Sequence, residues 1–184
     1  MKWSIDKSFD FCYGHRVWSQ RLDVAYSLDS CLACRHLHGH QGRIKIFLEA
    51  HELERGMVTD FKHLGWFKAW LDATLDHKFI IDRNDPLFSD MMSHYCRDGK
   101  MDRGRFTHHA EGYWTPRLEL LDDAGEALRE KYEGMVVVDF IPTSEHLTAW
   151  ILRIVAERMA PMGVHVSAVE FWETPKSHCR VEAQ

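Results

Sequence analysis

The sequence predicts an α+β fold in which helices cover one face of an antiparallel sheet. Alternating apolar residues mark strands, and apolar residues spaced three and four apart mark helices. These segments occur in the order strand, strand, helix, insertion, strand, helix, strand. The length of 184 residues suits one domain, 1–184, with an insertion at about 83–133.

The first two predicted strands run from Trp3 to His15 and from about His38 to about Leu48. In the first strand, large apolar residues occupy the odd-numbered positions and are interrupted only by Lys7. In the second strand, Ile44 and Ile46 alternate with basic residues. Both patterns have the two-residue repeat of a strand with one buried face.

Three histidines share the parity of these apolar positions. Because the two strands follow each other in the chain, they pair most simply antiparallel, and His15, His38 and His40 then converge at one end of one face. Neutral imidazoles bind zinc, and three protein ligands leave the fourth position open, as in catalytic zinc sites. The alternative is that the His38 and His40 pair is coincidental in a chain with 13 histidines.

A helix is predicted after Asp60, which is a candidate N-cap residue. Leu64, Phe67, Leu71 and Leu75 follow at helical spacing. They predict an amphipathic helix that buries one face.

A strand at 135–141 and a second helix follow the insertion. Thr143 or Ser144 can cap this helix, and Pro161 with Gly163 ends it. The last strand is expected at 164–173. The helix carries an apolar stripe made of Leu147, Ile151, Ile154, Val155 and Met159.

The segment 83–133 is dominated by turn signals, and a short charged helix is predicted at Ala124–Tyr132. His108-His109 and Tyr113-Trp114 stand out in it. These residues either have a function or belong to a surface excursion that packs its own small cluster.

Charge and composition exclude several classes of protein. A formal net charge of −5 argues against broad nucleic-acid binding. No stretch approaches the roughly 18 consecutive apolar residues of a membrane span, and Lys2, Asp6 and Lys7 stand where a signal peptide would be apolar. Five cysteines are an odd number for a disulfide framework. We therefore expect a cytoplasmic protein with free thiols and without nucleic-acid or membrane partners.

Cys34 lies close to the predicted metal site in the sequence. A thiol beside a metal ion or a cation loses its proton readily and can act as a base or nucleophile. A buried structural thiol is one alternative. Another is a closed zinc site in which Cys31 and Cys34 join a nearby histidine, as in non-catalytic interaction modules. No second CxxC pair supports it.

Two further acidic positions attract attention. Asp76 precedes His77 at the end of the first predicted helix, and a carboxylate beside an imidazole can set its tautomer and assist proton transfer. Helix-end surface chemistry is the alternative. Glu173 ends the last strand, where its carboxylate could accept two hydrogen bonds from an amidine-like ring edge.

Six short motifs occur in one order along the chain. They are Phe11–His15, Cys34–His40, Gly56–Phe61, Leu75–His77, Pro142–Glu145 and Glu173–Pro175. This set resembles the 6-pyruvoyl-tetrahydropterin synthase and 6-carboxy-tetrahydropterin synthase family, and it covers nearly the whole chain outside the insertion. Ordinary members are shorter between His77 and Pro142, so the insertion could cover the active site, alter an interface or shift the substrate.

The resemblance implies a role for each motif. His15, His38 and His40 match the Zn²⁺ ligands, and Cys34 matches the catalytic cysteine. Asp76 with His77 matches a proton-relay pair. Among the substrate-binding positions, Glu173 matches the carboxylate that anchors the pterin ring. The segment that lines the pterin pocket is matched by Thr143, Ser144 and Glu145.

The short spacing between Cys34 and His38 resembles the bacterial carboxy-tetrahydropterin synthases of the queuosine pathway. It implies conversion of 7,8-dihydroneopterin triphosphate to 6-carboxy-5,6,7,8-tetrahydropterin, with release of acetaldehyde and triphosphate. Zinc would act as a Lewis acid on the side-chain oxygens, Cys34 would move protons on the adjacent carbons, and His77 oriented by Asp76 would be the partner acid and base. The alternative is a 6-pyruvoyl-tetrahydropterin synthase or a related pterin aldolase.

The resemblance also implies a tunnelling fold and an assembly. Each subunit would contribute a four-stranded antiparallel sheet backed by two helices, three subunits would close an oligomeric barrel, and two trimers would form a homohexamer with active sites between subunits. Closing the sheet removes exposed strand edges.

The triphosphate requires cationic partners. Four basic residues lie near the motifs, and the sequence alone does not choose among Arg16, Arg21, Arg35 and Lys78.

Overall fold

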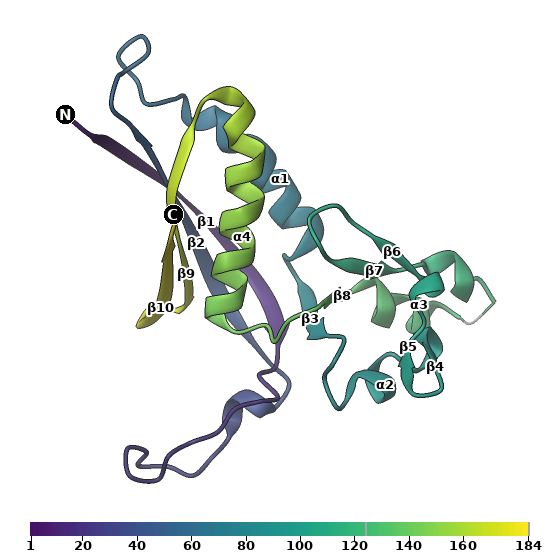
Figure 1. Ribbon diagram of the computed structural model, residues 1–184. Helices are drawn as coiled ribbons and strands as arrows, with labels where there is room; N and C mark the ends of the chain where they lie inside the picture. Colours follow the sequence, from purple (N-terminus) through teal and green to yellow (C-terminus); the bar gives the residue numbers. More distant parts are fainter. Residues whose placement is uncertain (124, 184) are drawn as a thin grey trace. The chain divides into compact units, whose positions relative to one another are not determined.

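The structure is a computed structural model that describes residues 1–123 and 125–183, and the chain divides into two compact units (Figure 1). The first unit holds residues 1–12, 40–76 and the residues from Ser144 onward, and the second holds 13–39 and 77–143. The described residues of the predicted insertion, 83–133, all belong to the second unit. A single domain spanning 1–184 stays a prediction.

The sheet of the first unit has the strand order β10, β9, β2, β1. Strand β9 (His165–Thr174) pairs antiparallel with β2 (His38–Ala50) on one side and with β10 (Ser177–Glu182) on the other. Ile44, Ile46 and Leu48 of β2 are fully buried, as the alternation in the sequence predicts. Strand β1 (Trp3–His15) also has the predicted bounds. Strand β10 was not predicted.

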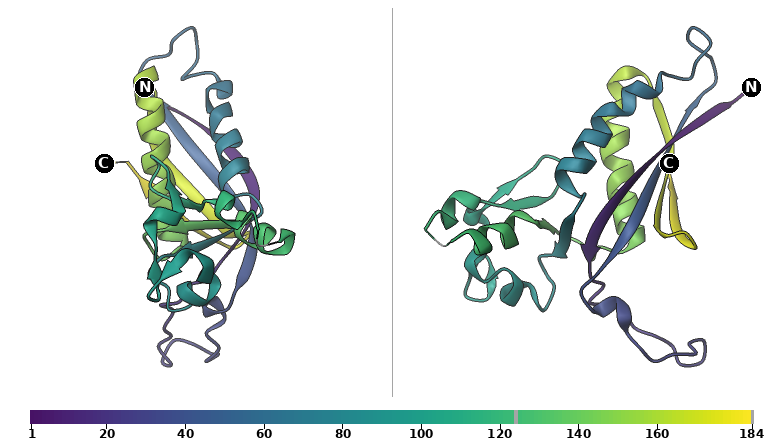
Figure 2. Two further views of the ribbon diagram at one scale, coloured as in Figure 1. Left: turned by 90° about the vertical axis from the view of Figure 1, so that its right-hand side faces the viewer. Right: turned by 180° about the vertical axis from the view of Figure 1, so that it is seen from behind.

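Two helices of the first unit, α1 (Gly65–Thr74) and α4 (Ser144–Met159), lie on one face of these strands (Figure 2). Phe67 of α1 packs edge to face against Phe9 of β1, with ring centroids 5.0 Å apart. Edge-to-face ring pairs contribute beyond the area that they bury. The predicted apolar stripes are confirmed, because their residues are buried. They are Leu64, Phe67, Leu71, Leu75, Leu147, Ile151, Ile154, Val155 and Met159.

Asp60 has the predicted capping role. Its carboxylate accepts a hydrogen bond of 2.8 Å from the backbone nitrogen of Lys62 and caps the 3₁₀ turn Phe61–Leu64 that leads into α1. Residues of this kind stabilise a helix start because the first backbone N–H groups have no partner within the helix.

The second unit contains parallel strand pairs, which differ from the antiparallel sheet that the sequence predicts. The end of β1 pairs parallel with β3 (Lys78–Asp82), and β3 pairs parallel with β8 (Met135–Val138). In the strand order of the sheet, β8 is followed by β7 (Trp114–Pro116) and then by β6 (Phe106–His108). The four-stranded, wholly antiparallel sheet is therefore wrong for the described chain. Strand β3 is a short apolar run with no alternation, and such runs are difficult to assign.

The predicted insertion shares one apolar core with β3 and β8, which contribute Ile81, Met135 and Val137. Besides β6 and β7, its short elements are α2 (Phe88–Met91), β4 (Cys96–Arg97), β5 (Lys100–Met101) and α3 (Glu126–Glu133). Tyr95 and Tyr132 are fully buried and pack edge to face, with ring centroids 4.8 Å apart. The helix predicted at Ala124–Tyr132 corresponds to α3, but its predicted first residue, Ala124, lies outside the described residues. The two interpretations of His108-His109 and Tyr113-Trp114 stay predictions.

None of the helices in residues 1–123 and 125–183 is both long and apolar enough to cross a membrane.

Candidate active site

His15 is the last residue of β1, and its side chain is 1% exposed. Its Nδ1 lies 2.6 Å from the carbonyl oxygen of Pro142. A carbonyl oxygen only accepts hydrogen bonds, so Nδ1 carries the proton and donates. Nε2 is then the nitrogen with a lone pair for a metal ion.

His38 is fixed in a similar way at the first position of β2. Its Nδ1 lies 2.8 Å from the carbonyl oxygen of His36, so this ring also carries its proton on Nδ1 and presents Nε2. The ring centroids of His15 and His38 are 4.6 Å apart. Backbone carbonyls that hold the far nitrogen are a common way to orient metal-binding imidazoles.

His40 follows His38 by two positions on the same strand, so both side chains point to the same side. One ligand nitrogen from each of His15, His38 and His40 lies within 4.8 Å of the others. The structure thus brings the predicted trio together. The carbonyl contacts fix the tautomers of two of these three imidazoles. Three imidazole nitrogens are a set of ligands that fits a zinc ion whose fourth coordination position is open.

Gly39 allows the two strands to approach at this point. A Cβ atom at Gly39 would lie 2.9 Å from the carbonyl oxygen of Tyr13, which is closer than a carbon atom and an oxygen atom normally come. Any side chain here would push β2 away from the end of β1. The glycine between the two β2 histidines is therefore required by strand spacing.

Asp76 and His77 follow the end of α1, and both lie close to Cys12 of β1. Oδ1 of Asp76 accepts a hydrogen bond of 2.8 Å from the backbone nitrogen of Cys12. The Cys12 thiol, the Asp76 carboxylate and a ring nitrogen of His77 lie within 4.8 Å of one another. His77 has a φ of 57°, a conformation that is uncommon for residues other than glycine. Sequence reasoning gave Cys12 no role, because only the pairing of β1 with β3 reveals this neighbourhood.

Cys34 lies in the 3₁₀ turn Ala33–Arg35 and is half-buried. Its carbonyl oxygen accepts a hydrogen bond of 2.7 Å from the backbone nitrogen of Val17. Among the described residues, Cys34 is in neither of the two clusters of metal-ligating side chains. All five cysteines are free, as expected.

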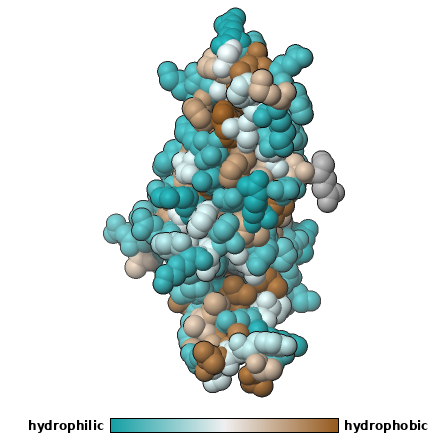
Figure 3. Space-filling model, turned by 90° about the vertical axis from the view of Figure 1, so that its left-hand side faces the viewer, coloured by the Kyte–Doolittle hydropathy of each residue, from teal (hydrophilic) through white to brown (hydrophobic). Residues whose placement is uncertain are grey.

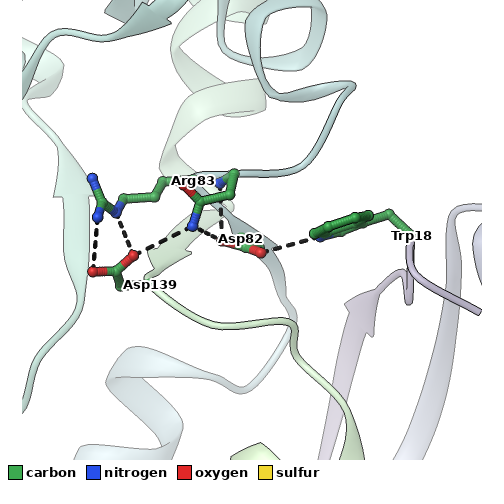
Figure 4. A network of polar contacts seen from close by, with 5 residues as sticks. Trp18, Asp82, Arg83 and Asp139 are labelled. Carbon is green, nitrogen blue, oxygen red and sulfur yellow. Dashed lines mark hydrogen bonds and ion pairs between the residues drawn. The ribbon is translucent and has the colours of Figure 1, made fainter.

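The chain that follows His15 is anchored to the last residue of β3 (Figure 4). Trp18 donates a hydrogen bond of 3.1 Å from Nε1 to Asp82, which is 2% exposed. Nearby, Arg83 donates two hydrogen bonds to Asp139, one of them 3.0 Å long. These bonds hold the pKa of Asp139 below its ordinary value of 3.8, against the opposite effect of burial.

Arg16 is part of the same anchor. Its Nε lies 3.2 Å from Oδ2 of Asp85, and the two side chains are 8% and 1% exposed. A guanidinium that is buried and paired is not available to a triphosphate. Of the other candidates, Lys78 donates to the carbonyl oxygen of Glu133 at 3.1 Å, while Arg21 and Arg35 are exposed. Arg21 and Arg35 therefore stay candidates for binding a triphosphate.

The predicted pterin-binding residues lie in two places. Glu173 is half-buried near the end of β9, and Ser144 with Glu145 opens α4. Thr143 directly precedes α4, and its backbone nitrogen donates a hydrogen bond of 2.7 Å to the carbonyl oxygen of Ile141. Their roles stay predictions.

Comparison with known proteins identifies the family of the chain. The family model described as 6-pyruvoyl tetrahydropterin synthase matches residues 4–184. The chain belongs to this family. A 6-carboxy-5,6,7,8-tetrahydropterin synthase from Aquifex aeolicus is 31% identical over 189 aligned residues, which cover 96% of each chain.

Solved structures share the fold of this chain. An uncharacterized protein from Wolinella succinogenes has a TM-score of 0.95 at 50% identity, with 100% of this chain and 99% of that chain covered. A 6-pyruvoyltetrahydropterin synthase from Plasmodium vivax has a TM-score of 0.58 at 17% identity, which shows a shared fold. The predicted family and the α+β class are confirmed.

Proposed function

We propose that this protein is a zinc-dependent lyase that converts 7,8-dihydroneopterin triphosphate and one water molecule to 6-carboxy-5,6,7,8-tetrahydropterin, acetaldehyde and triphosphate. This reaction belongs to the biosynthesis of queuosine and other 7-deazaguanines. The observation that carries the proposal is the cluster of His15, His38 and His40, in which two rings present Nε2. The name of the Aquifex aeolicus relative supports the choice of product.

The residues of the chain divide the chemistry among them. His15, His38 and His40 hold the metal, which when bound supplies a Lewis acid for the oxygens of the pterin side chain. Cys34 removes and returns protons on the adjacent carbons, and His77 beside Asp76 serves as the partner acid and base. Glu173 anchors the pterin ring, and Thr143, Ser144 and Glu145 line its pocket.

The absence of Cys34 from the described cluster around Asp76 and His77 bears on the assembly. The cluster around this pair contains Cys12 and not Cys34, while the family resemblance places active sites between subunits. We therefore propose that Cys34 of one subunit meets Asp76 and His77 of a neighbour. On this proposal the isolated subunit is inactive.

Exposed apolar side chains support an oligomer. Figure 3 shows a largely hydrophilic face with several apolar side chains exposed on it, and the segment 16–37 also exposes large apolar residues. Within this segment Val24 is 85% and Tyr26 90% exposed. Exposed apolar groups of this kind mark protein contact surfaces. We propose a homohexamer built from two trimers.

Product analysis tests the reaction. The purified zinc-loaded protein is incubated with 7,8-dihydroneopterin triphosphate, the pterin is identified by mass spectrometry, and acetaldehyde is measured with an alcohol dehydrogenase. Acetaldehyde and a carboxylated pterin in equal amounts are the expected result. A pterin that keeps its three-carbon side chain would instead identify a 6-pyruvoyl-tetrahydropterin synthase or a related pterin aldolase.

The Cys34→Ala variant distinguishes the proposed enzyme from the alternative, a non-catalytic zinc-binding domain. The enzyme keeps its zinc and its fold in this variant but loses turnover. A structural site that uses Cys31 and Cys34 would lose metal and folding together.

A further inference from the structure

Cys12, Asp76 and His77 form a second group of potential metal ligands, here called the Cys12 cluster. Their ligand atoms lie within 4.8 Å of one another. The proposed reaction uses Asp76 and His77 but gives Cys12 no task.

Two backbone features hold the Cys12 cluster together. The backbone nitrogen of Cys12 donates to Oδ1 of Asp76 at 2.8 Å, which turns the carboxylate toward β1. In the parallel pairing of β1 with β3, Tyr13 lies opposite Lys78. Cys12 directly precedes Tyr13, and His77 directly precedes Lys78. The backbone pairing of the two strands therefore makes Cys12 and His77 neighbours, whatever their side chains are.

The donors in the Cys12 cluster have the chemistry of a zinc-type site. Thiolate, imidazole and carboxylate are the three groups that bind Zn²⁺ in proteins, and thiolate selects against Mg²⁺ and Ca²⁺. Cys12 and His77 are exposed in the single subunit, so an ion from solution can reach them there and water can complete the coordination. The strand pairing and the hydrogen bond exist before any ion arrives, which lowers the cost of assembling the ligands.

We infer that Cys12, Asp76 and His77 bind a second divalent ion of the zinc class, separate from the site of the three histidines. An ion held there engages Asp76 and His77 and removes them from proton transfer. Excess zinc then inhibits the enzyme. The binding site stands independently of the proposed function, whereas the inhibition rests on it.

Cobalt titration tests the site, because Co²⁺ replaces Zn²⁺ and a thiolate ligand adds a charge-transfer absorption in the near ultraviolet. Metal-free protein is titrated with Co²⁺, and equilibrium dialysis counts the bound ions. The wild type is expected to bind two ions per chain and to develop the thiolate absorption. Cys12→Ser should bind one ion and lose this absorption, while keeping the visible bands of a histidine-bound ion.

Matched thiol variants complete the test. Cys31→Ser and Cys34→Ser should keep the thiolate absorption of the wild type. The inference is overturned if the wild type shows no such absorption, if Cys12→Ser retains it, or if Cys34→Ser removes it. Circular dichroism checks folding, and Cys12→Ala provides a second removal of the thiol if Cys12→Ser does not fold.

Inhibition is measured as the ratio of turnover in excess Zn²⁺ to turnover with one equivalent, each protein being compared with itself. This ratio should fall several-fold for the wild type and stay near one for Cys12→Ser. Equal ratios in the two proteins would refute the inhibitory role. If turnover is absent altogether, the proposed function fails while the cobalt titration still decides whether the site exists.

Discussion

The carbonyl oxygen of Pro142 lies 2.6 Å from Nδ1 of His15. This contact joins the end of β1 to the segment just before α4, although 127 positions separate the two residues. It also leaves Nε2 of His15 as the nitrogen that would face a metal ion. A residue from a distant motif thus orients a proposed zinc ligand without itself being one of the proposed ligands.

The first prediction concerns zinc content. His38→Ala removes one of three nitrogen donors, and we expect the purified protein to lose most of its zinc and its turnover. His36→Ala is the matched control, because His36 contributes its backbone carbonyl oxygen to His38 and this atom is unchanged. Elemental analysis by mass spectrometry measures both. Equal zinc content in the two variants would contradict the three-histidine site.

The second prediction concerns strand spacing at Gly39. Gly39→Ala places a Cβ atom 2.9 Å from the carbonyl oxygen of Tyr13, so the strands must move apart. We expect a loss of about 1–3 kcal/mol in the free energy of unfolding, the usual cost of overpacking. Denaturant unfolding measures the change.

Gly65→Ala is the control for this variant. Gly65 begins α1, and a Cβ atom there would meet nothing within 4 Å. Alanine is also the better helix former, so this variant should keep or raise stability. A Gly39→Ala variant as stable as Gly65→Ala would show that the strands tolerate a side chain.

Local periodicity explains how much of this fold could be predicted. The alternation in β1 and β2 indicates which face each histidine shares, and the stripes of α1 and α4 indicate which residues are buried. The alternation and the apolar stripes each lie within a single strand or helix, so they can be recognised without knowing the rest of the fold. The predicted convergence of His15, His38 and His40 required only that the two strands be neighbours, and β1 and β2 are adjacent.

The parts that could not be predicted depend on contacts between distant segments. The parallel pairing of β1 with β3 leaves no trace in the periodicity of either strand, and it alone brings Cys12 to His77. Arg16 was a candidate for binding triphosphate until its buried contact with Asp85 was known. Asp85 lies in the predicted insertion, whose path the turn signals did not reveal.

The third prediction concerns this buried ion pair. Asp85→Asn leaves the charge of Arg16 buried without a counter-charge, and removing one partner of such a pair typically costs about 3–5 kcal/mol. The double variant Arg16→Met, Asp85→Leu removes both charges and should recover most of this loss. Denaturant unfolding gives the free energies of both.

An exposed pair provides the comparison. Arg153 and Glu157 on α4 are 46% and 65% exposed, so Glu157→Gln should change stability by less than about 0.5 kcal/mol. If Asp85→Asn is no more destabilising than Glu157→Gln, the Arg16 guanidinium is solvated in solution and becomes a candidate for binding triphosphate again.

The fourth prediction concerns the pH dependence of stability through Asp139. Hydrogen bonds from Arg83 lower the pKa of Asp139 in the folded state below its ordinary value of 3.8. The ionised carboxylate therefore stabilises the fold above pH 3.8, and this contribution disappears as the pH falls through the lower, folded-state value. The Asp139 side chain is 46% exposed, so solvent screening limits the contribution to less than about 1 kcal/mol.

Asp139→Asn should therefore be slightly less stable than the wild type at neutral pH, and the difference should shrink toward zero in acid. Urea unfolding of both proteins at a series of pH values measures this difference directly. Asp122→Asn is a suitable control, because Asp122 is paired with Arg129 and its side chain is 69% exposed. A difference for Asp139→Asn that stays constant through the acid range would mean that the loss comes from packing or geometry, and that the charge of Asp139 does not stabilise the fold.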